Sequence, residues 1–169
     1  MVTFDDKHLL DTRQYFTQLT LENKLAQRNE FFPCACSGIN SLQDVLANLR
    51  RKKAFVCIDD TNDAATEQIG GGWFRRRSIT VFVLIRYRID DMEDRQQKLD
   101  ICREIFRQFH SRMIRDKERF VSMDHSFLDV SRIYTRELGE YFLSGCTGLY
   151  FMLEIPEPVN LMYDGSEWI

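Results

Sequence analysis

The sequence predicts a single α+β domain in which a mostly antiparallel sheet of about four strands carries a long amphipathic helix on one face. Residues 91–117 place apolar side chains at helical spacing over many turns, which indicates that helix. Four shorter apolar segments are typical of strands, and their order favours hairpins over a strict alternation of strands and helices. The chain has 169 residues, no internal repeat and no Pro/Gly/Ser-rich linker, so one domain is expected over residues 1–169.

Residues 1–40 are expected to form a helical extension. A helix is predicted from about Asp11 to Gln27 because its apolar residues recur at loosely helical spacing. The segment FFPCACSG, Phe31 to Gly38, is expected to interrupt it with proline and glycine. A short helix then begins at Ser41, which forms a capping arrangement with Asp44. The apolar face of this helix consists of Leu42, Val45, Leu46 and Leu49, and the basic run from Arg50 to Lys53 follows its end.

Two strands are predicted next. Ala54 to Ile58 is a short strand that ends at the polar sequence DDTND. The glycines at 70–72 precede a long strand from Phe74 to Arg88. Both faces of this strand are apolar in its middle, so we expect it to be central in the sheet and covered on both sides.

The most regular element is a helix from about Asp91 to Lys117. Asp90 is its expected N-cap, acidic residues fill the first turn, and basic residues fill the last turn, as the helix dipole favours. The side chains expected to be buried are Leu99, Cys102, Ile105, Phe106, Phe109 and Met113.

Two further strands complete the predicted sheet. They run from about Phe127 to Glu137 and from Cys146 to Ile155. Pro156 and Pro158 are expected to end the second of them, because proline cannot donate to a strand ladder. Residues 159–169 are expected to form an irregular tail.

Composition argues against several classes of function. The net charge of -3 is not that of a dedicated DNA-binding domain, so no specific nucleic-acid partner is expected. The longest apolar run, Ile79 to Ile85, is broken only by Thr80 and is far shorter than the roughly 20 residues of a membrane helix. The acidic start MVTFDDKHLL lacks the features of a signal peptide. A cytoplasmic protein is therefore expected, with its five cysteines as buried free thiols.

The sequence contains no recognisable catalytic motif, so we expect a protein that is not an enzyme and that needs no cofactor or metal. The glycines at 70–72 precede a strand and lack the GK[ST] of a phosphate loop, which favours a simple turn. Cys34 and Cys36 form a single CxC without the paired spacing of a zinc site. Cys57 and Cys102 have the surroundings of core residues, not those of catalytic nucleophiles.

Clusters of aspartates follow two of the predicted strands. Carboxylates at strand ends can hold Mg²⁺, so a metal-dependent nuclease is an alternative function. The sequence DDTND is, however, typical of a loop, and DDMED is typical of a helix start. The residues concerned are Asp59, Asp60, Asp63, Asp90, Asp91 and Asp94.

The segment IGGGWFRRRSITVFVLIRYR combines aromatic and basic side chains around the long strand. Arg and Trp are the residue types that contribute most to protein interfaces, so we expect a protein-interaction site here, with Gly70 to Arg77 as a projecting hairpin loop. The alternative is that these charges only solvate the strand ends and prevent edge-to-edge aggregation. The candidate interaction residues are Trp73, Phe74, Arg75, Arg76, Arg77, Arg86 and Arg88.

The order and character of these elements resemble a family of bacteriophage structural proteins. The segments that carry the resemblance are RRRSITVFVLIRYR, DDMEDRQQKLDICREIFRQF and GLYFMLEIPEP. Over residues 40–158 the layout is similar to that of the tail-terminator and head–tail completion proteins of tailed phages and prophages. The resemblance implies a non-enzymatic subunit of the virion, made in the bacterial cytoplasm. It also implies a ring of identical copies, possibly a hexamer, that caps the tail tube and meets the head connector. A monomeric α+β interaction adaptor is the remaining alternative.

Overall fold

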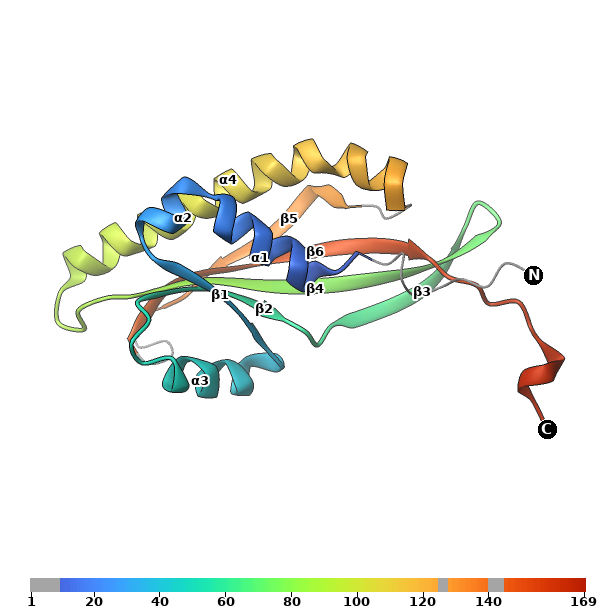
Figure 1. Cartoon of the computed structure of the whole chain (residues 1–169), viewed down its shortest axis with the longest axis horizontal. Helices are drawn as coiled ribbons and strands as arrows, with labels where there is room; N and C mark the ends of the chain where they lie inside the picture. The colour runs from blue at the N-terminus through green and yellow to red at the C-terminus, as the bar shows by residue number, and fades with distance from the viewer. Residues whose placement is uncertain (1–9, 125–127, 140–144) are drawn as a thin grey trace.

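The computed structural model describes residues 10–124, 128–139 and 145–169. They form a mixed sheet of six strands with helices on both faces (Figure 1). The α+β class and the long helix are therefore confirmed. The expected number of strands was too low, and the sheet contains one parallel pair. No helix in these ranges is both long enough and apolar enough to cross a membrane.

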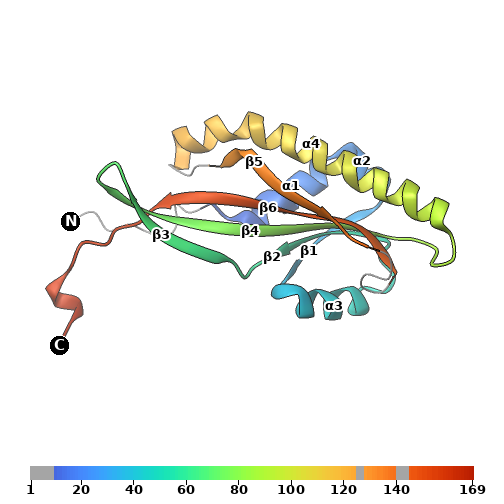
Figure 2. The same cartoon turned by 180° about the vertical axis from the view of Figure 1, so that it is seen from behind.

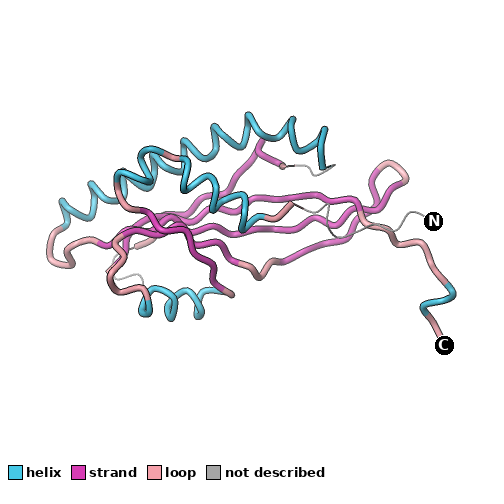
Figure 3. The backbone as a smooth tube through the Cα atoms, viewed as in Figure 1, coloured by secondary structure: helices cyan, strands magenta, loops and turns pink. Residues whose placement is uncertain are grey.

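The elements are shown by type in Figure 3. The helices are α1 (Thr12–Glu22), α2 (Lys24–Arg28), α3 (Gly38–Asn48), α4 (Met92–Asp124) and the short 3₁₀ turn η2 (Gly165–Glu167). The strands are β1 (Phe31–Cys36), β2 (Ala54–Asp59), β3 (Asp63–Ile69), β4 (Gly72–Arg86), β5 (Asp129–Glu137) and β6 (Cys146–Pro158).

Strand β4 is the centre of the sheet, whose order is β1-β2-β4-β6-β5. One side of β4 pairs with β6 along almost its whole length. The other side pairs first with β3, up to Ser78, and then with β2, from Val81 onwards. Strands β1 and β2 are parallel, and the other pairs are antiparallel. The prediction of a central long strand is thus confirmed.

The two faces of the sheet contact different helices. Helices α1, α2 and α4 cover one face, and α3 covers only one end of the other face (Figure 2). Within β4, Val81 and Val83 point into the core under α1 and α4, whereas Phe82 and Leu84 point into a smaller cluster under α3. This alternation buries the middle of β4 on both faces, as predicted.

The N-terminal part differs from its prediction in two places. The single helix expected up to Gln27 is divided at Asn23, whose side chain accepts a hydrogen bond from the Ala26 amide and so begins α2. The expected break at Phe31 to Gly38 is instead strand β1 as far as Cys36. Pro33 is tolerated there because β1 lies at the edge of the sheet.

Helix α3 begins at Gly38, three residues before the predicted Ser41, so the expected capping pair is wrong. Its first amide is held by a distant residue, because the Gly38 N–H donates to Asp59 Oδ1 at 3.0 Å. Leu42 and Leu46 are fully buried on the apolar face, as expected.

Helix α4 is capped one residue later than predicted and continues beyond Lys117. Asp91, and not Asp90, accepts a hydrogen bond from the Asp94 amide at 2.9 Å. Five of the six side chains predicted to be buried are buried. The exception is Phe106, which is half-buried and packs against Phe151 of β6.

Strand β6 continues through Pro156 to Pro158, so the predicted stop is wrong. The register between β5 and β6 reaches only Glu154, and beyond it β6 pairs with β4 alone. A proline nitrogen is tolerated on such an open edge because no partner strand requires its hydrogen. Strand β5 was predicted to begin at Phe127 and begins at Asp129. Leu128 precedes the strand, and Phe127 lies outside the described ranges. The tail from 159 is irregular apart from η2.

Candidate functional site

The end of the sheet that α3 leaves uncovered is the candidate site, and it is called the outer end here. It consists of β3, residues 72–78 of β4, residues 154–158 of β6 and the segment 159–169. Figure 1 shows the β3–β4 hairpin tip and the segment 159–169 at this end, away from α3. The segment is tied to the sheet at its start, where the Val159 amide donates to the carbonyl of Trp73 at 3.0 Å.

The glycines form the tip of the hairpin, as predicted, but the predicted loop from Gly70 to Arg77 is too long, because β4 begins at Gly72 and pairs with β3 from there. Ile69 pairs with Gly72, which leaves Gly70 and Gly71 as a two-residue loop. Both have positive φ, 57° and 85°, the combination that a type I′ turn requires. A side chain added at either position would contact nothing within 4 Å, so the tip is open to solvent.

Arg77, one of the candidate interaction residues, is largely buried. Its Nε donates to Glu157 Oε2 at 2.8 Å, and a terminal nitrogen donates to Oε1 of the same carboxylate at 2.5 Å. That nitrogen also donates to the carbonyl of Leu10 at 3.1 Å. The Arg77 side chain is 14% exposed and that of Glu157 only 1%. This two-pronged pair joins β4 to β6 and to the residues before α1.

Arg76 is likewise engaged within the chain, on the opposite face of β4. Its Nε contacts Glu67 of β3 at 2.8 Å, and a terminal nitrogen contacts Glu154 of β6 at 2.9 Å. The hydrogen bonds to Glu67 and Glu154 raise the pKa of the guanidinium further. Arg76 therefore bridges both neighbours of β4.

Two of the predicted residues at the outer end do expose their side chains. Arg75 is exposed, and Trp73 is 43% exposed beside the hairpin tip. Phe74, between them, is half-buried. The predicted aromatic and basic rim is thus reduced at this end to Trp73 and Arg75.

The remaining two predicted residues lie at the other end of β4. Arg86 donates to the carbonyls of Leu46 and Lys52, at 2.8 and 3.0 Å, and so holds the end of α3 against the sheet. Arg88 is exposed and pairs with Asp91 at 2.7 Å, at the start of α4. The seven predicted residues therefore do not form one continuous surface.

The sequence prediction missed the most exposed apolar side chains, which lie in segment 159–169. Met162 is 84% exposed and Trp168 is 68% exposed, and the Trp168 ring stacks on that of Tyr163 with 6.2 Å between centroids. Leu161 is also exposed. Two aromatic and two aliphatic residues within eight positions form a signal that the sequence contains, whereas the prediction for this tail is only that it is irregular.

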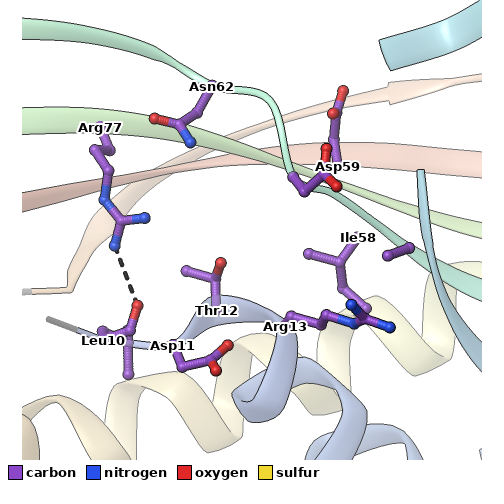
Figure 4. A pocket seen from close by; sticks show the side chains of 10 residues that line it. Leu10, Asp11, Thr12, Arg13, Ile58, Asp59, Asn62 and Arg77 are labelled. Atoms are coloured by element: carbon purple, nitrogen blue, oxygen red, sulfur yellow. Dashed lines mark hydrogen bonds between the residues drawn. The ribbon is translucent and has the colours of Figure 1, made fainter. Parts of the chain in front are cut away.

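A small pocket of about 210 Å³ lies between the start of α1, the bend after β2, and Arg77 (Figure 4). Several of its polar groups have hydrogen-bond partners elsewhere in the chain. Asp59 Oδ1 accepts from the amide and the hydroxyl of Thr61 as well as from the α3 terminus. Asn62 Oδ1 is buried without a hydrogen-bond partner. The Arg77 and Asp59 side chains at this pocket therefore already have partners within the chain.

The aspartates considered as metal ligands have structural contacts. Asp60 accepts from the Ser37 hydroxyl at 2.6 Å, and Asp91 caps α4. Asp63 begins strand β3. Within the described ranges, no group of three or more His, Cys, Asp or Glu side chains has an arrangement that could hold a metal ion.

A buried polar cluster joins α1 to α4. The Tyr15 hydroxyl donates to Asp116 at 3.1 Å, and Arg112 donates to the same carboxylate at 2.9 Å. Burial, together with the Asp116 charge, raises the pKa of Tyr15 well above its ordinary value, so the phenol stays protonated. These contacts join the two helices.

Comparison with known proteins found no matching family model, no matching curated protein and no matching solved structure.

Proposed function

We propose that this chain is a structural, non-enzymatic protein of the tail-terminator or head–tail joining type, which assembles into a ring with copies of itself. The observation that supports the proposal best is the exposed apolar segment 159–169 at the uncovered end of the sheet. Adjacent to it, Trp73 and Arg75 add an exposed aromatic and an exposed cation. The proposed partners are a second copy of the chain, the tail tube and the head connector.

The exposed side chains make self-association favourable. Full burial of a large apolar side chain contributes about 1.5–3 kcal/mol. Leu161, Met162, Tyr163 and Trp168 together would therefore supply enough free energy for a specific contact, after part of it is offset by the cost of ordering the segment. Exposed apolar groups gathered on a segment that leaves the body of a domain are typical of interaction sites.

The position of the segment allows the contact that a ring requires. When a segment at one end of an elongated subunit binds a different surface of its neighbour, and the contact is not returned, the arrangement is head-to-tail. Such contacts close into a ring when the rotation between subunits allows it. Arg76 and Arg77 have their carboxylate partners within the same chain, so the interaction role proposed for this rim passes to Trp73 and Arg75.

Native mass spectrometry and negative-stain electron microscopy of the purified protein test the proposal. The wild type should form rings at high concentration. A variant with Met162→Ser and Trp168→Ser should remain monomeric with an unchanged melting temperature, because both side chains are exposed. Arg51→Ser, an exposed change beside α3, is the matched control and should assemble as the wild type does.

Two outcomes would contradict the proposal. Wild-type protein that stays monomeric, both alone and when mixed with purified tail tubes, would favour the monomeric adaptor. Rings that form equally well from the Met162 and Trp168 variant would leave self-assembly in place but would exclude this segment as its cause. No contact of the aspartate clusters favours the nuclease alternative, since Asp59, Asp60 and Asp91 each hold backbone or hydroxyl groups.

A further inference from the structure

Three thiols converge where β1 pairs with β2. Cys34 and Cys57 are register partners across the parallel pair, and their Sγ atoms are 3.0 Å apart. Cys36, two residues along the same face of β1, belongs to the same buried cluster as Cys57. The cluster lies on the face of the sheet that α3 covers.

The backbone geometry of this pair suits a covalent bond. Neighbouring strands lie about 4.8 Å apart, and disulfides join Cα atoms separated by about 4.4–6.8 Å. The two sulfurs need to approach by only about 1 Å to reach the bond length of about 2.05 Å. Side-chain rotation supplies a movement of that size without displacement of either strand.

The three thiols differ in their access to solvent. Cys34 is half-buried on β1, an edge strand of the sheet, whereas Cys36 and Cys57 are buried. An oxidant from solvent therefore meets Cys34 first. The other two cysteines, Cys102 and Cys146, are fully buried, and burial raises the pKa of the Cys146 thiol to about 11.

We propose that Cys34 and Cys57 are an oxidisable thiol pair that a hydroperoxide converts into a disulfide. The Cys34 thiolate attacks one peroxide oxygen, the O–O bond breaks, and an alcohol or water leaves, so that Cys34 becomes a sulfenic acid. The Cys57 sulfur then attacks the Cys34 sulfur, the S–O bond breaks, and water leaves with the Cys57 proton. A dithiol reductant reverses the change by thiol–disulfide exchange.

The bond would link an edge strand to its neighbour around α3. Cys34 and Cys57 are 23 positions apart, and the loop between them contains the whole of α3. Strand β1 lies at the edge of the sheet and pairs with β2 alone. Oxidation therefore adds a covalent bond between this edge strand and its neighbour. The inference depends on neither ring assembly nor a phage origin.

The test treats the folded, fully reduced wild-type protein with hydrogen peroxide and then removes the peroxide. The protein is unfolded in guanidinium chloride so that every remaining thiol is accessible, these thiols are blocked with N-ethylmaleimide, and the peptides are mapped by mass spectrometry. We expect the number of alkylated cysteines to fall from the five of the reduced chain by two. We also expect one peptide pair that contains Cys34 linked to Cys57, and its loss after dithiothreitol. Cys36→Ser should retain this link, because Cys36 is not a partner in it.

Cys57→Ser identifies the partner. In this variant Cys34 should accumulate as a sulfenic acid, trapped by dimedone, and no intramolecular link to Cys34 should form. Peptide mapping of the wild type remains decisive if the variant fails to fold. The proposal is overturned if all five wild-type thiols remain alkylatable after peroxide. It is also overturned if Cys34 appears only as a sulfinic or sulfonic acid, or only in links between two chains.

Discussion

The Arg77–Glu157 pair provides a quantitative test of how the outer end is held together. Both partners are largely removed from water, and the pair makes two charge-assisted hydrogen bonds of 2.8 and 2.5 Å. Glu157→Gln keeps the volume of the side chain but leaves the guanidinium without a counter-charge. Removal of one partner of a buried ion pair costs about 3–5 kcal/mol, and we expect about 3 because Arg77 keeps its bond to the Leu10 carbonyl.

Glu154→Gln is the matched control. Glu154 lies three residues earlier on the same strand and pairs with the neighbouring Arg76 at 2.9 Å, but its side chain is half-exposed. Because water screens an exposed pair, we expect this change to cost less than about 1 kcal/mol. Urea titrations followed by circular dichroism measure both free energies of unfolding. The midpoint should fall sharply for Glu157→Gln at an unchanged slope.

A double replacement separates desolvation from attraction. Arg77→Met combined with Glu157→Leu leaves no uncompensated charge, so it should be less destabilising than Glu157→Gln alone. The reasoning is refuted if Glu157→Gln and Glu154→Gln lower the free energy of unfolding equally, by less than about 1 kcal/mol. The pair would then have the energetics of a surface contact despite its burial.

Three further changes have expected outcomes. Gly148→Ala should prevent stable folding, seen as insoluble expression or loss of a thermal transition, because the new Cβ would lie 2.0 Å from the Val83 carbonyl oxygen in a backbone with φ of +144°. Phe109→Ala should lower the free energy of unfolding by about 3–5 kcal/mol in a denaturant titration, since this ring is fully buried under α4. The hydrogen bond from Arg103 lowers the pKa of Glu137, so the stability that this pair contributes is present above the ordinary carboxyl pKa and is lost as the pH falls through the lowered value. Glu137→Gln should therefore reduce the acid-induced loss of stability by a small amount, below about 1 kcal/mol because the pair is exposed, in titrations between pH 7 and pH 3.

The elements with strong local patterns were predictable from sequence. Helix α4 has a long apolar stripe with matched charges at its start, and β4 has an apolar centre from Val81 to Ile85, so each specifies its own structure. The Gly70–Gly71 turn was also predictable, because two consecutive residues with positive φ favour glycine.

The missed elements depend on partners far away in sequence. Strand β3, DAATEQI, is almost wholly exposed and has no apolar alternation, so only its pairing with β4 makes it a strand. The start of α3 depends on Asp59, which follows Gly38 by 21 positions. The prolines in β1 and β6 were mistaken for breaks because sequence alone does not reveal which strand segments lie on an open edge.

The candidate site was predictable in composition but not in pairing. The position of Trp73 and the arginines near a hairpin followed from the sequence. The burial of Arg77 did not follow from the sequence, because it depends on the register of β4 and β6. In that register Glu157 lies opposite Arg75, which is on the same face of β4 as Arg77. Three consecutive arginines suggest one charged patch in the sequence. In a strand, however, successive side chains point to opposite faces of the sheet, so the three do not lie together.

The unbroken ladder between β4 and β6 has a mechanical consequence. Its register runs without interruption from Phe74↔Pro158 at the outer end to Arg86↔Cys146 beneath the helices. A force applied to the hairpin tip along the strand direction therefore loads these hydrogen bonds together in shear, and does not open them one after another as in peeling. A load at Trp73 reaches Val83 in the core along a single strand. A force on the outer end is thus transmitted directly to the core of the domain.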